Sequence, residues 1–214
     1  MIRTLFVDAG GVLYNNINEE TDFLVRVADR YGVDRTELAR RVEEAAPAYE
    51  DGGTHVHRVF ERIVAAGRGR PCGGPADRSW LDRAYTDSVH AYEDSFSALR
   101  ALRRERPGLA VVLTNNEAEH WDRLKDAAFG HFALFDSVCS SWRVRRVKPS
   151  GSFFAEALRR CRATAAETLL VDDRVTVLRA GAALGMRTLH VSTPEVLARR
   201  LRQAVGGGSL PATS

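Results

Sequence analysis

Three short apolar runs of the chain are each followed by polar side chains that could take part in chemistry. The runs cover residues 5–7, 111–113 and 169–171, and the polar residues are Asp8, Thr114 and the pair Asp172-Asp173. Runs of this length are typical of strands that are buried on both faces of a parallel sheet. Because ligands of open α/β sheets bind at the carboxyl ends of the strands, we expect these carboxylates and the hydroxyl to meet in one crevice.

Lysine is rare in the sequence, although basic residues are common. Of 31 Lys and Arg residues, only Lys125 and Lys148 are lysines. A compact ammonium on a flexible stem fits between a carboxylate and a phosphate, where the planar guanidinium of arginine does not. We therefore predict that Lys148, which precedes Pro149 in a loop, enters the crevice. Lys125 stands in a polar run, and we predict that it lies on a solvated helix.

The elements that position these residues alternate between strands and helices, with one long helical interruption after the first strand. Strands are expected at about 3–8, 109–113, 137–140, 168–171 and 187–191, whereas the apolar spacing from 19 to 104 is helical. The predicted fold class is α/β, a Rossmann-like parallel sheet core flanked by helices, with a helical cap inserted after the first strand. We assign residues 1–14 and 106–205 to the core domain, 15–105 to the cap domain and 206–214 to a disordered tail.

Local residues mark several ends of the helices in this cap. Gly32 is expected to stop one helix, Asp34 to begin the next, and either Asp77 or Ser79 to begin another. Residues 67–75 are rich in Gly, Pro and Arg and are predicted to form a loop. A cap at the mouth of the crevice would exclude water and select substrates.

The composition limits the classes of function. The content of 44% hydrophobic and 28% charged residues is that of a globular protein, and the net charge of +3 is mild. The arginines are scattered among acidic residues, which argues against nucleic acid as a partner and favours a small anionic molecule. The odd number of cysteines (Cys72, Cys139 and Cys161) and their spacing indicate free thiols in a reducing compartment. With no apolar run long enough for a signal peptide or a membrane span, we expect a cytoplasmic location.

The four motifs together resemble those of the haloacid dehalogenase-like (HAD) superfamily, and the resemblance covers nearly the whole chain. The motifs are Asp8, Thr114-Asn115-Asn116, Lys148-Pro149 and Asp172-Asp173, in this order. Residues 135–138 and 182–186 add to the resemblance. The paired aspartates are similar to the fourth motif of a subgroup that includes sugar-phosphate phosphatases and the phosphatase domain of soluble epoxide hydrolase. Residues 49–53 of the cap also look like this subgroup.

The resemblance implies a role for each acidic residue. Asp8 would be the nucleophile that forms an aspartyl-phosphate. The cofactor would be Mg²⁺, held by Asp8, the carbonyl of Gly10 and Asp173, since hard oxygen ligands suit this ion. Asp172 would orient Lys148 or Thr114. Lys148 would offset the clustered negative charge, without which Asp8 would take up a proton.

The resemblance also implies substrate contacts. Thr114 and neighbouring groups at Asn115, Asn116 and Gly11 would bind the phosphoryl oxygens and the substrate. The predicted function is a magnesium-dependent phosphatase for a small phosphorylated metabolite. A 2-haloacid dehalogenase with the same nucleophile, or a catalytically degenerate binding or regulatory protein, are the alternatives. No nucleic acid or membrane partner is expected, and the sequence is compatible with a homodimer.

Two positions depart from the pattern of HAD phosphatases. Gly10 stands where these enzymes usually carry a second Asp that protonates the leaving group, and Val177 stands where the fourth motif usually ends in Asn or Asp. A substrate with a good leaving group, such as an anomeric sugar phosphate or an acyl phosphate, would need less acid catalysis. Alternatively, another residue replaces the missing Asp. The candidates are His55, His57, Glu117 and His120, although we expect the first two to be surface histidines.

Overall fold

The computed structural model, which describes residues 1–67 and 76–206, is built on a five-stranded parallel sheet. The strand order is β3-β2-β1-β4-β5, and every neighbouring pair is parallel. The strands are β1 (Thr4–Val7), β2 (Ala110–Leu113), β3 (Ser137–Val138), β4 (Thr168–Asp172) and β5 (Arg187–His190). This arrangement confirms the predicted α/β class, although β3 is shorter than the expected strand at 137–140.

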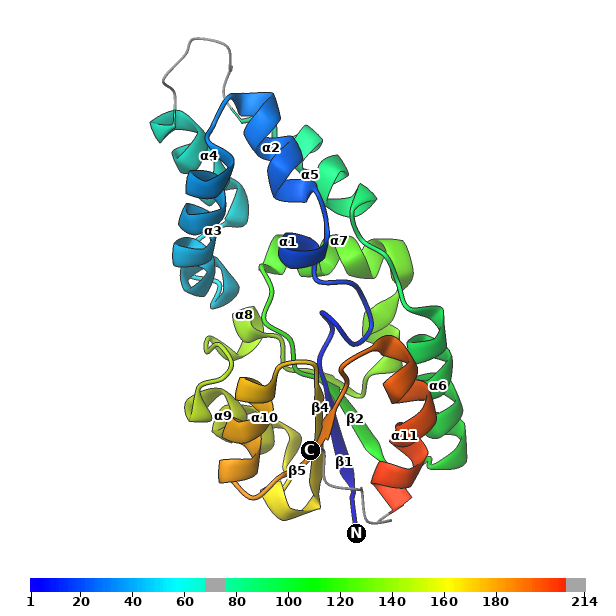
Figure 1. The fold of residues 1–214 in the computed structure, drawn as a ribbon. Coiled ribbons are helices and arrows are strands. Elements are labelled where there is room, and N and C mark those ends of the chain that lie inside the picture. Colours follow the sequence, from blue (N-terminus) through cyan, green and yellow to red (C-terminus); the bar gives the residue numbers. More distant parts are fainter. Residues whose placement is uncertain (68–75, 207–214) are drawn as a thin grey trace.

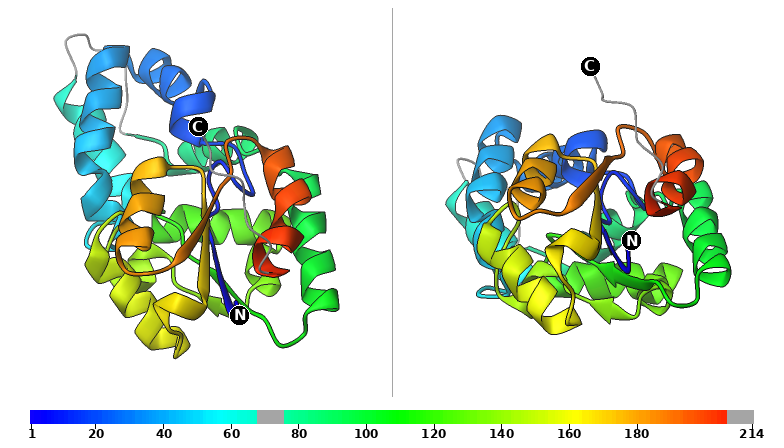
Figure 2. Two further views of the ribbon diagram at one scale, coloured as in Figure 1. Left: turned by 60° about the horizontal axis from the view of Figure 1, so that its bottom comes forward. Right: turned by 90° about the horizontal axis from the view of Figure 1, so that it is seen from below.

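Helices cover both faces of the sheet and continue beyond its carboxyl edge (Figure 1). They are α1 (Ile17–Glu20), α2 (Phe23–Tyr31), α3 (Arg35–Glu50), α4 (Val56–Ala66), α5 (Arg78–Asp87), α6 (Glu93–Glu105), α7 (Glu119–Phe129), α8 (Ser141–Val144), α9 (Gly151–Cys161), α10 (Val175–Ala183) and α11 (Pro194–Gly206), with short 3-10 turns at His131–Leu134 and Ala165–Glu167. Helices α6 and α11 lie on one side of the sheet, and α9 and α10 on the other (Figure 2). Helices α1–α5 lie above the carboxyl ends of the strands.

The central strands β1, β2 and β4 are buried because successive side chains enter two different hydrophobic clusters. Leu5 and Val7 belong to a large cluster, and Phe6 between them belongs to a smaller cluster on the opposite face. The large cluster continues to Phe23 of α2 and Phe60 of α4. The sheet and the helices above it therefore share one continuous core, which holds them together over the crevice.

The predicted helix ends agree with the structure where it describes them. The Asp34 carboxylate accepts a hydrogen bond from the Glu37 amide at the start of α3. The Asp77 carboxylate does the same for the Trp80 amide, so Asp77 rather than Ser79 begins α5. Gly32 ends α2 in the left-handed conformation.

Parts of two predictions lie outside the described residues. These are the loop at 67–75, of which only Gly67 is described, and the disordered tail at 206–214, of which only Gly206 is described, as the last residue of α11. Cys72 is also outside, whereas Cys139 and Cys161 are free thiols with their sulfur atoms 3.8 Å apart.

The division into core and cap stays a prediction, and the position of helix α6 bears on where the boundary between the two lies. Helix α6, the last element of the predicted cap, packs against α11 beside the sheet, where Arg202 forms an ion pair with Glu105 at 2.7 Å.

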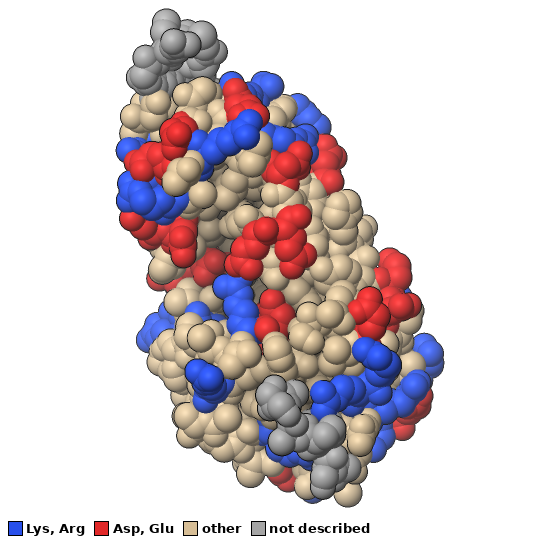
Figure 3. Space-filling view, in the orientation of Figure 1, with Lys and Arg blue, Asp and Glu red and all other residues tan. Residues whose placement is uncertain are grey.

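On the face in Figure 3, basic and acidic side chains are interspersed. Within the described part of the chain, no helix has both the length and the apolar character needed to cross a membrane.

Candidate active site

Strands β1, β2 and β4 place Asp8, Thr114 and Asp172 at one edge of the sheet. Val7 pairs with Leu113 on one side and with Val171 on the other, so the residues that follow them are neighbours. Two backbone hydrogen bonds continue the ladders past β1: the Asp8 amide donates to the Val171 carbonyl (3.0 Å) and the Thr114 amide to the Val7 carbonyl (2.8 Å). The carboxyl edge therefore holds these residues rigidly together.

Lys148 reaches into this edge from the loop between α8 and α9. Its Nζ lies 3.0 Å from Asp8 Oδ1 and 2.7 Å from Asp172 Oδ2, and all three side chains are buried. Asn116 fixes the loop, since its side-chain amide donates to the Lys148 carbonyl (3.0 Å) and accepts from the Lys148 amide (2.8 Å). Asp8 Oδ1 also accepts from the Ala9 amide at 2.7 Å. Asp8 Oδ2 is consequently the oxygen left for attack on a substrate.

The crevice holds more negative than positive charge. Asp8, Asp172 and Asp173 each offer a carboxylate oxygen within 4.8 Å of the others. Burial and the Asp172 carboxylate raise the pKa of Asp8 to about 8, in spite of Lys148. Burial also raises the pKa of Asp173, whose Oδ1 is buried without a hydrogen-bond partner among the described residues. A divalent cation would satisfy this oxygen and the excess charge, so the donor set fits Mg²⁺.

Thr114 also presents an unsatisfied group. Its side chain is completely buried, and Oγ1 finds no partner in the described part of the chain. A buried hydroxyl without a partner is costly, so a ligand oxygen at this position would be stabilised. The Asn115 side chain donates a hydrogen bond from Nδ2 to Asp122 Oδ1 at 3.1 Å. Its Oδ1 atom is buried and has no hydrogen-bond partner among the described residues.

The two glycines after Asp8 are packed against polar side chains. A Cβ at Gly11, where φ is +65°, would lie 2.3 Å from Asp173 Oδ2, so only glycine fits. A Cβ at Gly10 would lie 2.6 Å from Asn16 Oδ1. The Asn16 amide in turn donates to Asp173 Oδ2 at 3.0 Å. Asn16 thus occupies the space in which a side chain at position 10 would begin.

The prediction of a solvated Lys125 is wrong. Lys125 is buried, its Nζ lies 2.6 Å from Glu117 Oε2, and it also lies over the Tyr14 ring. Burial lowers the pKa of Lys125, but the Glu117 and Asp122 carboxylates outweigh it and leave the pKa raised. Lys125 and Asp122 are buried because other elements cover their face of α7, whereas Arg123 in the same polar run is exposed.

Two cavities that share residues open above Asp8. One of about 120 Å³ is lined by Glu50, Glu117 and Lys125 among others, and one of about 290 Å³ by Asp8, Lys148 and again Glu50. Gly10, Asn16 and Asn116 line both.

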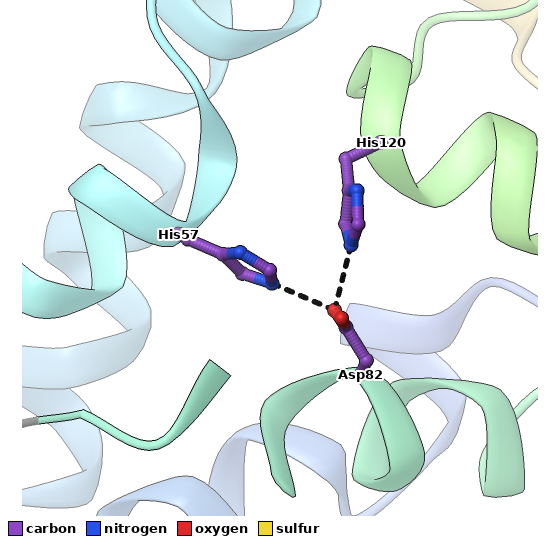
Figure 4. A group of neighbouring side chains, drawn as sticks. All are labelled: His57, Asp82 and His120. Carbon is purple, nitrogen blue, oxygen red and sulfur yellow. Dashed lines mark hydrogen bonds and ion pairs between the residues drawn. The ribbon is translucent and has the colours of Figure 1, made fainter. Parts of the chain in front are cut away.

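The histidines considered as replacements for the missing Asp lie away from these cavities. His55 and His120 line a different cavity, and His57 is buried beside Asp82 (Figure 4). The expectation of a surface position is therefore wrong for His57. Val177 is buried in the smaller hydrophobic cluster, although it also borders the larger crevice cavity.

The fold defines an α/β protein of the Rossmann-like class with an acidic crevice at the carboxyl edge of its sheet. A family model of haloacid dehalogenase-like hydrolases matches residues 2–185, and the chain therefore belongs to this family. It is accordingly an enzyme, a hydrolase of the HAD type.

One curated relative is the sesquiterpene phosphatase of Aspergillus oryzae, to which the chain is 33% identical over 111 residues. The match covers 51% of this chain and 55% of that protein, so it spans about half the length of the relative.

Solved structures share the fold. A HAD family enzyme of Bacteroides thetaiotaomicron in complex with magnesium and inorganic phosphate has a TM-score of 0.73 and 19% identity, over 89% of this chain and 94% of that chain. The L-2-haloacid dehalogenase of Xanthobacter autotrophicus has a TM-score of 0.61 and 22% identity, over 99% and 85%.

Sequence reasoning missed Asn16 and Glu50 as residues that line both crevice cavities. Asn16 follows Asp8 by only eight residues, but nothing in its local pattern shows that it fills the space beside Gly10. Glu50 lies in the cap segment that resembles the phosphatase subgroup. A carboxylate at the end of a helix that faces the crevice could have been suspected from that resemblance.

Proposed function

We propose that the protein is a magnesium-dependent phosphatase that forms an aspartyl-phosphate on Asp8. The observation that carries this proposal is the convergence of Asp8, Asp172 and Asp173 beside Lys148. Displacement of halide from carbon requires no pair of metal-binding carboxylates, whereas phosphoryl transfer uses a cation to offset charge. The phosphatase relative and the magnesium and phosphate complex of a structural neighbour support the same interpretation.

The residues of the crevice have distinct roles in this mechanism. Asp8 Oδ2 attacks phosphorus, the bond to the leaving-group oxygen breaks, and water later hydrolyses the aspartyl-phosphate. Lys148 favours the charged form of Asp8, and Thr114 Oγ1 donates a hydrogen bond to a phosphoryl oxygen. Mg²⁺ bound by Asp8, the Gly10 carbonyl and Asp173 would offset the charge of the phosphoryl group.

Glu50 is our candidate for the proton transfer that Gly10 cannot perform. It lines both crevice cavities, and burial together with the Glu117 carboxylate raises the pKa of Glu50 to about 7. A carboxyl group with such a pKa donates a proton to a leaving group near neutral pH. Glu117 is less suitable, because Tyr85 (2.8 Å), Lys125 and the Ala118 amide already bind its carboxylate.

The leaving group tests the role of Glu50. We expect Glu50→Gln to lower kcat by about 10²–10⁴-fold for alkyl phosphates, and much less for p-nitrophenyl phosphate, whose phenolate leaves without a proton. Glu43→Gln is the matched control, since Glu43 is an exposed residue of the same helix at the edge of the larger cavity. An equal loss for both leaving groups would assign Glu50 to binding instead.

The crevice indicates a small, polar substrate. The smaller cavity is lined largely by amide and carboxylate side chains, such as Asn15, Asn18 and Glu19, beside the rings of Tyr49 and Trp121. Such donors and acceptors bind the hydroxyl groups of a small phosphorylated metabolite better than a terpenoid chain. A panel with sugar, acyl and prenyl phosphates would separate these classes.

The decisive experiment is this panel measured with Mg²⁺ and with EDTA, beside a 2-haloacid assay. We expect magnesium-dependent hydrolysis of a phosphate ester, and a loss of at least about 10³-fold in Asp8→Asn. The exposed Asp87→Asn is the control. Hydrolysis that survives in Asp8→Asn would refute the nucleophile, and halide release in EDTA would favour the dehalogenase. Failure with every ester, with no beryllofluoride adduct at Asp8, would favour a degenerate binding protein.

A further inference from the structure

A second cluster of ionisable side chains joins three helices (Figure 4), and its residues line neither cavity of the Asp8 crevice. His57 of α4 and His120 of α7 both point at the carboxylate of Asp82 on α5. The His57 Nε2 atom lies 2.7 Å and the His120 Nε2 atom 2.9 Å from the same oxygen, Asp82 Oδ1. The three residues each offer a ligand atom within 4.8 Å of the others.

These donors differ in kind from those of the Asp8 crevice. Two imidazole nitrogens and one carboxylate oxygen suit zinc and related transition ions, whereas magnesium prefers oxygen ligands only. In a tetrahedral zinc site with bonds of about 2.0–2.1 Å, ligand atoms lie about 3.3 Å apart. The present separations from Asp82 Oδ1 need to widen by only about half an ångström, which small side-chain rotations provide.

A third imidazole and a cavity lie beside the cluster. The His55 ring is centred 5.0 Å from that of His57 and 5.2 Å from that of His120. His55 Nδ1 accepts a hydrogen bond from the His57 amide, which leaves Nε2 as the nitrogen that can bind an ion. The cavity, of about 380 Å³, is lined by His55 and His120 and provides an entry path and room for a fourth ligand.

We propose that His57, Asp82 and His120 bind a zinc-type divalent transition ion, with a water molecule or His55 as the fourth ligand. The ion ties α4 and α5, which lie above the sheet, to α7, which follows β2 and carries Lys125 of the active-site crevice. The site is therefore structural or regulatory, and its ligands are distinct from those of the Mg²⁺ that the phosphatase reaction would use. The proposal does not depend on the proposed function.

Calorimetric titration of the metal-free protein with ZnCl₂, in the presence of saturating Mg²⁺, tests this site. We expect one zinc ion per chain and a rise in Tm of about 5–10 °C at zinc a hundredfold above Kd. X-ray absorption at the zinc edge distinguishes the two sites, because imidazole scattering is expected here and the Asp8 crevice offers carboxylates.

Variants decide which residues bind the ion. Asp82→Asn and His120→Gln should each weaken zinc binding at least about a hundredfold. His90→Gln and Asp87→Asn, both exposed, are the matched controls and should bind zinc normally. His57 is buried, so the partly exposed His120 keeps the test independent of folding. Absence of zinc binding, binding without imidazole scattering, or undiminished binding in both Asp82→Asn and His120→Gln would overturn the proposal.

Discussion

Replacement of Gly11 by alanine separates the backbone requirement at this position from its contact with the predicted metal ligand Asp173. Gly11 and Gly32 have the same φ of +65°, but a Cβ at Gly32 meets nothing within 4 Å. Alanine in this left-handed conformation costs about 1–2 kcal/mol. Gly32→Ala therefore measures the conformational cost alone, which lowers Tm by about 2–4 °C for each kcal/mol.

Gly11→Ala carries an additional cost. The new Cβ would lie 2.3 Å from Asp173 Oδ2 and 2.5 Å from its Cγ, whereas ordinary contacts begin at 3.4 Å. The Asp173 carboxylate must therefore move by about 1 Å, a displacement that is expected to weaken Mg²⁺ binding about 10–100-fold.

The two effects are measured separately, by thermal unfolding with EDTA and by calorimetric titration with Mg²⁺. Gly32→Ala should lower Tm and leave Mg²⁺ affinity unchanged, whereas Gly11→Ala should lower Tm further and weaken Mg²⁺ binding. If the two variants are equally stable and bind Mg²⁺ equally well, the close contact between Gly11 and Asp173 does not shape the metal site.

Three further predictions concern a buried ion pair, a titrating carboxyl and a helix end. Lys125→Met leaves the mostly buried Glu117 carboxylate without its cation, which should lower the free energy of unfolding by about 3–5 kcal/mol in urea titrations. The double variant with Glu117→Gln should recover part of this loss, and no recovery would contradict the pairing. Since Glu50 must be protonated to act as an acid, kcat for alkyl phosphates should fall as pH rises through about 7, and Glu50→Gln should lack this limb. The pKa of Glu50 is about 7 in the folded protein and 4.5 in the unfolded chain, so the unfolded chain loses this proton at lower pH. The free energy of unfolding should therefore fall as pH rises from about 4.5 to 7. A plot of Tm against pH should be flatter over this range in Glu50→Gln. Asp34→Ala should cost about 1 kcal/mol in thermal unfolding through loss of the bond to the Glu37 amide, while Asp22→Ala, at a helix start without such a bond, should cost less.

The sheet and its crevice could be predicted because their determinants are local in the sequence. Strands β1, β2 and β4 are buried on both faces, so they are continuous apolar runs, and the residue after each run is at the carboxyl edge by geometry alone. The start of α3 at Asp34 is likewise set within four residues.

The environment of α7 could not be predicted because burial depends on what covers a helix. The run around Lys125 is polar, yet Lys125 and Asp122 are buried. The contacts of His57 and His120 with Asp82 join residues that are 25 and 38 positions apart in the sequence. Such contacts follow from the packing of α4, α5 and α7, which no local pattern contains.

Helix α7 connects the two sites physically. Asp122 accepts hydrogen bonds from the Asn115 side chain (3.1 Å), Ser140 (2.7 Å) and Trp142 (2.8 Å), and is fully buried. The helix is therefore bound to the residue next to Thr114 on one side and, through His120, to Asp82 on the other. An ion at the histidine cluster would restrict the same helix that positions Lys125 and Asn115 in the crevice. Because a packed helix moves as a unit, zinc occupancy and the order of the crevice should change together.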